Sequence, residues 1–138
     1  MRILGLDVGR KRIGIAVSDE LEITAQGIGI LKRESIKKDI ENISEIIKKY
    51  SVKKVVIGLP LNMNGTLGPE GEEIKKFGEK LRNYLNVDVE YWDERLSTVA
   101  AEKVLIDADI SRKKRKKVID KLAAVVILQN FLDSKFRC

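Results

Sequence analysis

The sequence predicts a single α/β domain, built on a five-stranded mixed sheet with helices on both faces. Two apolar runs near the start are joined by a short turn, which favours an antiparallel hairpin. Later apolar runs alternate with amphipathic helices, and a strand–helix–strand order implies parallel pairing with a right-handed crossover. No repeat or linker divides the 138 residues, so we expect one domain over residues 1–138.

The first three strands are expected to be antiparallel. Apolar residues fill positions 3–8 and 13–17, and a basic turn at residues 10–12 lies between them. A third strand is predicted over residues 23–31, where two closely spaced glycines, at positions 27 and 29, indicate a bend or bulge.

A helix, a strand and a second helix follow in that order. Ser35 can cap a helix whose isoleucines recur every three or four residues as far as Tyr50. Residues 52–58 read as a buried strand, and a loop rich in asparagine and glycine leads to Pro69, which suits the first turn of a helix. The alternating residues 87–92 predict the fifth strand.

Two helices are expected after the fifth strand. Ser97 or Thr98 opens a short helix that ends near Ile106. Six consecutive basic residues then occupy positions 112–117, and a final helix runs from about residue 117 to 132, with apolar residues on most sides.

The composition excludes several classes of enzyme. There is no histidine, and Cys138 is the only cysteine, which rules out a histidine general base, a His/Cys zinc site and an internal disulfide. Lys and Arg number 27 against 21 Asp and Glu, a formal charge of +6. That excess suggests an anionic partner, nucleic acid or a membrane surface, or else a charge-rich protein of the kind found in hot habitats.

The sequence shows no sign of a membrane protein. No segment approaches the apolar length of a membrane span, and the first residues lack the pattern of a signal peptide. We therefore expect a cytoplasmic protein that is not attached to a membrane, which a lone thiol also suits.

Acidic residues are expected to converge at one edge of the sheet. Asp7 lies inside an apolar strand, where an unpaired buried charge would be costly, and the neighbouring glycines would let a phosphate backbone approach. Asp93 and Glu94 directly follow the fifth strand, and Asp120 extends the apolar stripe of the last helix that contains Ala124. Each acid also has a structural explanation, as a turn cap, a solvated turn or a partner of the helix dipole.

Converging carboxylates would repel one another unless cations lay between them. Their oxygen atoms suit Mg²⁺ or Mn²⁺, and two such ions can activate a water and stabilise the leaving oxygen of a phosphodiester. This chemistry needs no histidine. The acids therefore predict a divalent metal site for phosphodiester hydrolysis.

Two basic segments are candidate contacts for the phosphate backbone, although each could also be a solvated loop. No aromatic residues are interleaved with them, so base stacking is not indicated. The residues concerned are Arg10, Lys11, Arg12, Arg112, Lys113, Lys114, Arg115, Lys116 and Lys117.

Four motifs, in order over almost the whole chain, resemble those of the YqgF (RuvX-type) family. They are Gly5-Leu6-Asp7-Val8-Gly9 with Arg12-Ile13-Gly14, Gly58-Leu59-Pro60-Leu61-Asn62 with Asn64-Gly65, Asp93-Glu94-Arg95-Leu96-Ser97-Thr98, and Asp120-Lys121-Leu122-Ala123-Ala124 with Ile127-Leu128. The resemblance implies a ribonuclease H-like fold and a bacterial cytoplasmic nuclease. Members are assigned to maturation of the 5′ end of 16S ribosomal RNA precursors, and are also described as Holliday junction resolvases.

The resemblance also implies roles for individual residues. Asp7, Glu94 and Asp120 match the acidic metal-binding and catalytic positions, and Asp93 ranks below Glu94 because either could turn inward. Three further positions match motif residues to which we assign substrate contact. They are Asn62, Arg95 and Thr98.

Other functions remain open at the level of sequence. One is an actin-like or sugar-kinase-like phosphotransferase, but this chain supplies one of the two domains that flank a nucleotide, and it has no Walker A or Gly-x-Gly-x-x-Gly pattern. Another is a non-catalytic nucleic-acid-binding module, which the acids argue against because carboxylates near phosphates hinder binding without metal. The sequence does not separate structured RNA from branched DNA, or ribosomal precursor particles from junctions as partners, or a monomer from a homodimer.

Overall fold

The computed structural model describes residues 1–96 and 112–135, and it describes the side chains of residues 1–95 and 122–135. The elements are β1 (Arg2–Val8), β2 (Arg12–Ser18), β3 (Ala25–Lys32), α1 (Ile36–Tyr50), β4 (Val52–Leu59), α2 (Pro69–Leu85), β5 (Asp88–Asp93), a 3₁₀ turn η1 (Glu94–Leu96) and α4 (Arg112–Lys135). The predicted short helix near residues 97–106 lies outside the described residues. No helix in the described ranges is both long enough and apolar enough to cross a membrane.

The five strands form one mixed sheet in the order β3-β2-β1-β4-β5. β1 pairs with β2, and β2 with β3, in antiparallel fashion, whereas β4 runs parallel to both β1 and β5. Ile15 pairs with Gly29 and Ala16 with Gly27, so one residue of β3 bulges out between them. The mixed sheet and the bulge that the sequence predicts are both confirmed.

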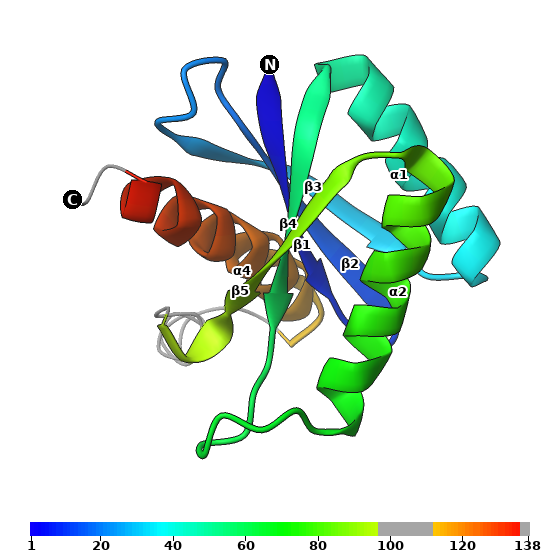
Figure 1. Cartoon of the computed structure of the whole chain (residues 1–138), viewed down its shortest axis with the longest axis vertical. Helices are drawn as coiled ribbons and strands as arrows, with labels where there is room; N and C mark the ends of the chain where they lie inside the picture. The colour runs from blue at the N-terminus through cyan, green and yellow to red at the C-terminus, as the bar shows by residue number, and fades with distance from the viewer. Residues whose placement is uncertain (97–111, 136–138) are drawn as a thin grey trace.

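Helices cover both faces of this sheet, as Figure 1 shows: α1 and α2 lie on one side and α4 on the other. Alternate residues of β1 divide between the two layers. Leu4 and Leu6 pack in the layer of α1 and α2, and Ile3 packs in the layer of α4. The predicted cap of α1 is present, because Ser35 Oγ accepts a hydrogen bond from the Lys38 amide at 3.1 Å.

Glycines in the central strands let α4 lie close to the sheet. A Cβ on Gly5 would lie 2.7 Å from Leu128 Cβ, and one on Gly58 would lie 2.5 Å from Ile127 Cδ1. Contacts this short leave no room for a methyl group. The expectation that Gly5 makes room for a phosphate backbone is therefore wrong, because the helix already fills that space.

Two further details differ from the expectation. β5 extends to Asp93, which was expected to follow the strand, and α4 begins at Arg112 rather than near residue 117, so the basic run is helical. Lys and Arg have high helix propensities, which lets the run continue the last helix backwards. The prediction of a single domain over residues 1–138 stays a prediction.

Candidate active site

The carboxyl ends of β1, β4 and β5 meet at one edge of the sheet, which lies at the bottom of Figure 1. Asp7 is the second-last residue of β1, and Glu94 directly follows β5. In the sheet register Leu6 pairs with Ile57, and Gly58 pairs with Trp92, so Asp7, Gly58 and Trp92 lie at about the same level. The topology therefore brings two of the predicted acids to one edge.

Asp7 lies on the α4 side of the sheet. Its side chain alternates in phase with Ile3 and Gly5, which both face α4. It is half-buried and pairs across the strands with Gly14 of β2. Because Gly14 has no side chain, the facing position of β2 places no side chain opposite the Asp7 carboxylate.

Glu94 lies on the same side as Asp7. Its Oε1 atom is 2.7 Å from the point that a Cβ on Gly58 would occupy, next to Ile127 of α4. Gly58 therefore makes space for the Glu94 carboxylate as well as for the helix. The Cβ of any other residue at position 58 would collide with Glu94 Oε1. The half-buried carboxylate stays at the α4 face of the edge.

Asp93 is engaged differently from Glu94. It receives hydrogen bonds from Arg95 Nε at 3.1 Å, from Arg95 Nη2 at 2.8 Å and from the Arg95 backbone amide at 2.9 Å. The Arg95 guanidinium lowers the pKa of the Asp93 carboxyl below its usual value, and the amide hydrogen bond adds to this. The geometry thus makes Asp93 the ion-pair partner of Arg95. The choice of Glu94 as the metal ligand stays a prediction.

Asp120 lies on α4, and the direction of that helix determines which end of the sheet the helical turn with residue 120 approaches. Gln129 bonds to the Ala25 amide and the Ile23 carbonyl, both at 2.9 Å, beside the start of β1, whereas Ala124 lies over Gly5 in the middle of that strand. From Ala124 to residue 120 the helix advances about 6 Å, and from Gly5 to residue 7 the strand advances about 6.6 Å. The backbone of α4 thus carries Asp120 toward the edge with Asp7.

No group of three potential metal-binding side chains occurs among the residues whose side chains are described. The Asp120 side chain lies outside them, as do those of Thr98 and of residues 112–117. The three-acid cluster and these nucleic-acid contacts therefore stay predictions.

The loop between β4 and α2 is a folded hairpin, with a bridge between Leu61 and Leu67. The Gly65 amide donates to the Asn62 carbonyl at 2.8 Å, which closes a turn, and Asn62 Nδ2 donates to Thr66 Oγ1 at 2.9 Å. Arg95 Nη1 donates to the carbonyls of Asn62 at 3.4 Å and Met63 at 3.2 Å. Asn62 and Arg95, expected as substrate contacts, thus also build the loop, which motif matching did not indicate.

The first basic segment lines an open groove of about 880 Å³, together with Lys32 and Arg33. Arg33 Nη1 donates to the Gly9 carbonyl at 2.9 Å, and Arg33 Nε donates to Asp39 at 3.2 Å. Asp39 is only 2% exposed. Arg33 therefore connects a buried carboxylate to Gly9, in the turn that follows Asp7. Sequence analysis missed the pair because Arg33 and Asp39 lie in unremarkable polar stretches.

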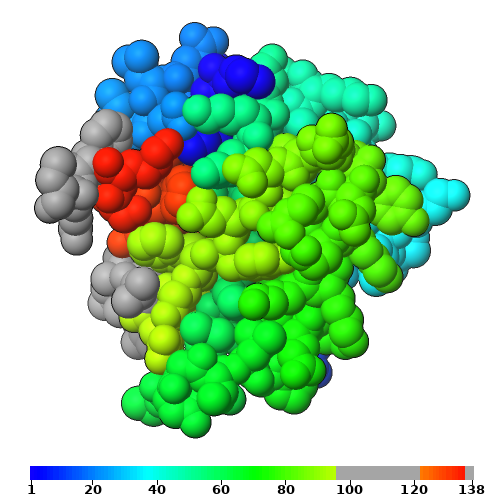
Figure 2. All heavy atoms as spheres, viewed as in Figure 1, coloured from blue at the N-terminus to red at the C-terminus, as the bar shows by residue number. Residues whose placement is uncertain are grey.

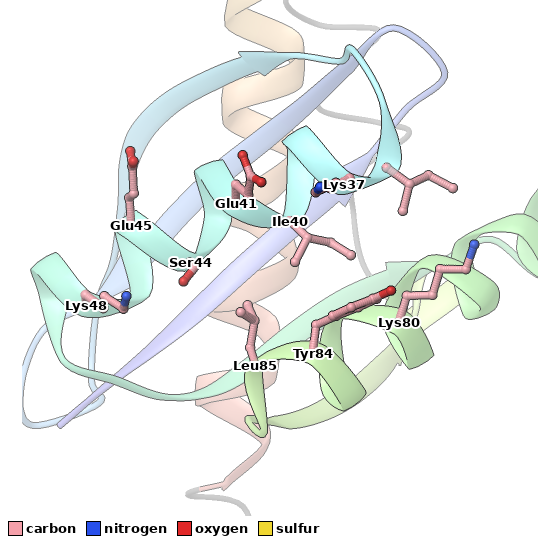
Figure 3. A pocket seen from close by; sticks show the side chains of 10 residues that line it. Lys37, Ile40, Glu41, Ser44, Glu45, Lys48, Lys80, Tyr84 and Leu85 are labelled. Atoms are coloured by element: carbon pink, nitrogen blue, oxygen red, sulfur yellow. The ribbon is translucent and has the colours of Figure 1, made fainter.

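A separate groove of about 800 Å³ lies between α1 and α2. Figure 3 shows Ile40 and Ser44 of α1 on the side toward Tyr84 and Leu85 of α2, whereas Glu41 and Glu45 point away from that helix. None of the predicted site residues lines it. The candidate active site is therefore the edge of the sheet and not this groove.

Comparison with known proteins identifies the family of the chain. The family model RuvX, described as Holliday junction resolvase, matches residues 1–134. The chain belongs to the RuvX family. The resemblance of the four motifs is thereby confirmed, and with it the prediction that the chain belongs to a family of nucleases.

RuvX relatives match over their full length. A protein of Caldanaerobacter subterraneus subsp. tengcongensis, named "Putative pre-16S rRNA nuclease", is 60% identical over 136 residues, which is 98% of either chain. One of Bacillus thuringiensis strain Al Hakam with the same name is 61% identical over 137 residues, covering 98% of this chain and 100% of the relative.

Solved structures confirm the ribonuclease H-like fold of this RuvX chain. RuvC of T. thermophilus in complex with a Holliday junction substrate has a TM-score of 0.59 at 14% identity, over 98% of this chain and 95% of RuvC. The Fowlpox virus resolvase with Holliday junction DNA has a TM-score of 0.61 at 16% identity, over 99% of this chain and 100% of the resolvase.

Proposed function

We propose that this protein is a divalent-metal-dependent endonuclease that hydrolyses phosphodiester bonds in structured nucleic acid, and that it processes the 5′ end of pre-16S ribosomal RNA. The observation that carries the proposal is the placement of Asp7 and Glu94 on the α4 side of one sheet edge, toward which the turn of Asp120 is directed. The full-length relatives named as pre-16S rRNA nucleases supply the substrate. Its location in the cytoplasm stays a prediction.

The donor set fits a hard divalent cation. The candidate ligands are carboxylates, and Gly58 leaves open the space that the Glu94 oxygen occupies. Asp7, Glu94 and Asp120 would hold Mg²⁺ or Mn²⁺, which when bound activates water and neutralises charge on the phosphate. The protein contributes fixed, half-buried oxygen atoms and a helix close enough to complete their arrangement.

Cleavage of Holliday junctions is the second candidate function. The family description and the two resolvase structures that share this fold favour it. Both candidates use the same edge of the sheet, and both need contacts with the phosphate backbone. They differ only in the nucleic acid presented to that edge.

Cleavage by the purified protein tests the proposal. We would offer a pre-16S RNA fragment with its 5′ extension, and separately a four-way DNA junction, each with Mg²⁺, Mn²⁺ or EDTA. We expect metal-dependent cleavage of the RNA within the 5′ extension, and loss of that cleavage in a folded Asp7→Asn variant. Cleavage of the junction alone would favour the second function, and no cleavage of either substrate by the folded wild-type protein would contradict the proposal.

A further inference from the structure

Met63 stands out among the exposed apolar residues. Its side chain is 97% exposed, more than any other large apolar side chain in the described ranges. The loop that carries it projects beyond the strand ends in Figure 1, and green atoms form the bottom of the molecule in Figure 2. A side chain this exposed buries almost no area on folding, so it contributes almost nothing to stability.

The loop nevertheless holds Met63 in a fixed place. Thr66 Oγ1 and the Thr66 amide both bond to Asn64 Oδ1, at 2.6 Å and 3.1 Å, which adds to the hydrogen bonds that close the turn at residues 62–65. Gly65 takes a positive φ of +87°, which the turn requires and glycine accepts without strain. Leu61 and Leu67, at the base of the hairpin, pack against the main core.

Arg95 holds the tip of this loop at the candidate active site. Its guanidinium is bound to Asp93 on one side and to the carbonyls of Asn62 and Met63 on the other. Arg95 directly follows Glu94, so one side chain links the tip of the loop to the neighbour of a predicted metal ligand. The exposed Met63 is therefore held beside the candidate active site.

The loop can come close to a nucleic acid without electrostatic cost. Residues 60–68 contain no charged side chain, in a protein where basic groups outnumber acidic ones. A methionine side chain is flexible and polarizable, so it packs against surfaces of varied shape, including aromatic rings. It cannot bind a phosphate, and its natural contact on a nucleic acid is therefore the face or edge of a base.

We propose that Met63 packs against a base of the nucleic-acid substrate next to the scissile phosphate, and that the Asp93–Arg95 pair positions it there. The inference rests on the proposed function. It assigns to this loop the contact that fixes which phosphate reaches the acids, whereas the basic residues hold the backbone without regard to position.

The test measures binding and base environment together, without cleavage. The probes are the pre-16S RNA fragment and the four-way junction, each with 2-aminopurine placed at successive positions around the cleavage site, in EDTA and over a series of salt concentrations. The variants are Met63→Ala and Met63→Leu. The matched control is Leu21→Ala, which removes another apolar side chain, 73% exposed, from the turn at the opposite end of the sheet.

For wild type, we expect 2-aminopurine fluorescence to change at one position beside the cleaved bond. Met63→Ala should lose that change and bind about tenfold more weakly, which corresponds to about 1.4 kcal/mol, with an unchanged slope of log K against log salt. Met63→Leu should keep most of the signal, and Leu21→Ala should match wild type. Changing Lys113 and Lys114 to Ser should instead flatten the slope, by about 0.7–0.9 for each lost phosphate contact.

Two results would overturn the inference. One is a Met63→Ala variant with wild-type affinity and fluorescence while the wild type cleaves its substrate, which leaves the proposed function intact. The other is a Met63→Ala variant that loses affinity together with salt slope, which would show a general loss of backbone contact. A wild-type protein that neither binds nor cleaves these nucleic acids would contradict the proposed function and this inference together.

Discussion

The two faces of the sheet are built in opposite ways. Toward α1 and α2 the strands present large side chains, among them Leu6 and Ile57, which pack with Ile43 and Phe77 in one cluster. The separation between sheet and helices is set there by side chains that interdigitate, as in most α/β cores.

Toward α4 the central strands present Gly5 and Gly58, and the helix presents Ala123 and Ala124, all of them buried. The helix backbone therefore lies close to the strands, with the Ala124 carbonyl oxygen 3.3 Å from where a Cβ on Gly5 would be. Carboxylate side chains are short, so acids on a sheet and on a helix can share a cation only when the two backbones lie close. The small residues of this face are thus part of the candidate site as well as of the core.

The largest difference in cleavage is expected between variants of the two neighbouring acids at the edge, Asp93 and Glu94. Glu94→Gln should lower cleavage by more than about a hundredfold, since loss of an outer residue around a metal already costs about 10–100-fold. Asp93→Asn removes only the carboxylate that pairs with Arg95, so it should lower cleavage by clearly less than Glu94→Gln does. Single-turnover cleavage of the pre-16S RNA fragment with Mn²⁺ measures both. Equal losses would mean that the edge does not distinguish the two acids.

The close packing of α4 can be broken with one methyl group. Gly5→Ala should lower the free energy of unfolding by about 1–3 kcal/mol, because the new methyl would collide with Leu128 and push the helix outward. The shift also moves the turn of Asp120 away from Asp7, so cleavage per folded molecule should fall. Urea unfolding and cleavage at matched folded concentration measure the two effects.

The opposite face supplies the control for that substitution. Ile43→Val removes one methyl group from the buried face of α1 and should lower the free energy of unfolding by about 0.5–1.5 kcal/mol. Its cleavage per folded molecule should equal that of wild type. If Gly5→Ala behaves in the same way, the tight contact of α4 serves stability alone.

The Asp93–Arg95 pair, which holds the loop through the carbonyls of Asn62 and Met63 and acts as its brace, should weaken only at acidic pH. Arg95 lowers the folded-state pKa of Asp93 below the ordinary value of 3.8, so the pair's contribution is complete above 3.8 and is lost as pH falls through the lower folded value. The methyl group of Met63, one of only two methionines, should keep its NMR position from neutral pH down to about 4 and then move. In Asp93→Asn the signal should already differ at neutral pH. A movement near pH 6 to 7 would contradict the assignment of the brace to this pair.

The smallest effect is expected at the far end of the sheet. Glu22 bonds to Lys53 at 3.2 Å and to Lys135 at 2.9 Å, which ties the turn before β3 to the end of α4. Both pairs lie at the surface, with the Glu22 side chain 21% exposed and the two lysines 41% and 38% exposed, so Glu22→Gln should change the free energy of unfolding by about 1 kcal/mol or less. Cleavage should not change, because this end of α4 lies away from the acids. A large loss of cleavage would mean that the two ends of the helix are coupled.

The fold was predictable where periodicity alone decides it. Apolar runs and isoleucine spacing located the strands and α1, and the pair of glycines located the bulge in β3. Gly5 was misread because a sequence does not say which surface fills the space above a glycine, and here Leu128 of α4 fills it. The start of α4 was misplaced because a run of six cations suggests a solvated loop, although each residue is a good helix former.

The candidate site was predictable only as a set of residue types at strand ends. Topology brings Asp7 and Glu94 to one edge, and strand order could be anticipated from the crossover rule. The side on which Asp93 or Glu94 lies depends on how the chain leaves β5 through η1, and no pattern of residues encodes that. The contact of Arg95 with the loop joins positions more than 30 residues apart, so it emerges only when the strands are paired.

Thermal unfolding with and without Mn²⁺ tests the central claim, that the α4 face closes a metal site from Asp7, Glu94 and Asp120. Metal that binds only the folded protein stabilises it by about 2.7 kcal/mol at a hundredfold excess over Kd, which raises the melting temperature by several degrees. We expect that shift in wild type, and a much smaller one in Asp7→Asn, Glu94→Gln and Asp120→Asn. Asp7→Asn should also melt higher than wild type in EDTA, since it removes repulsion between like charges. Equal shifts in all four proteins, or a destabilised Asp7→Asn in EDTA, would show that these acids are structural and bind no common metal.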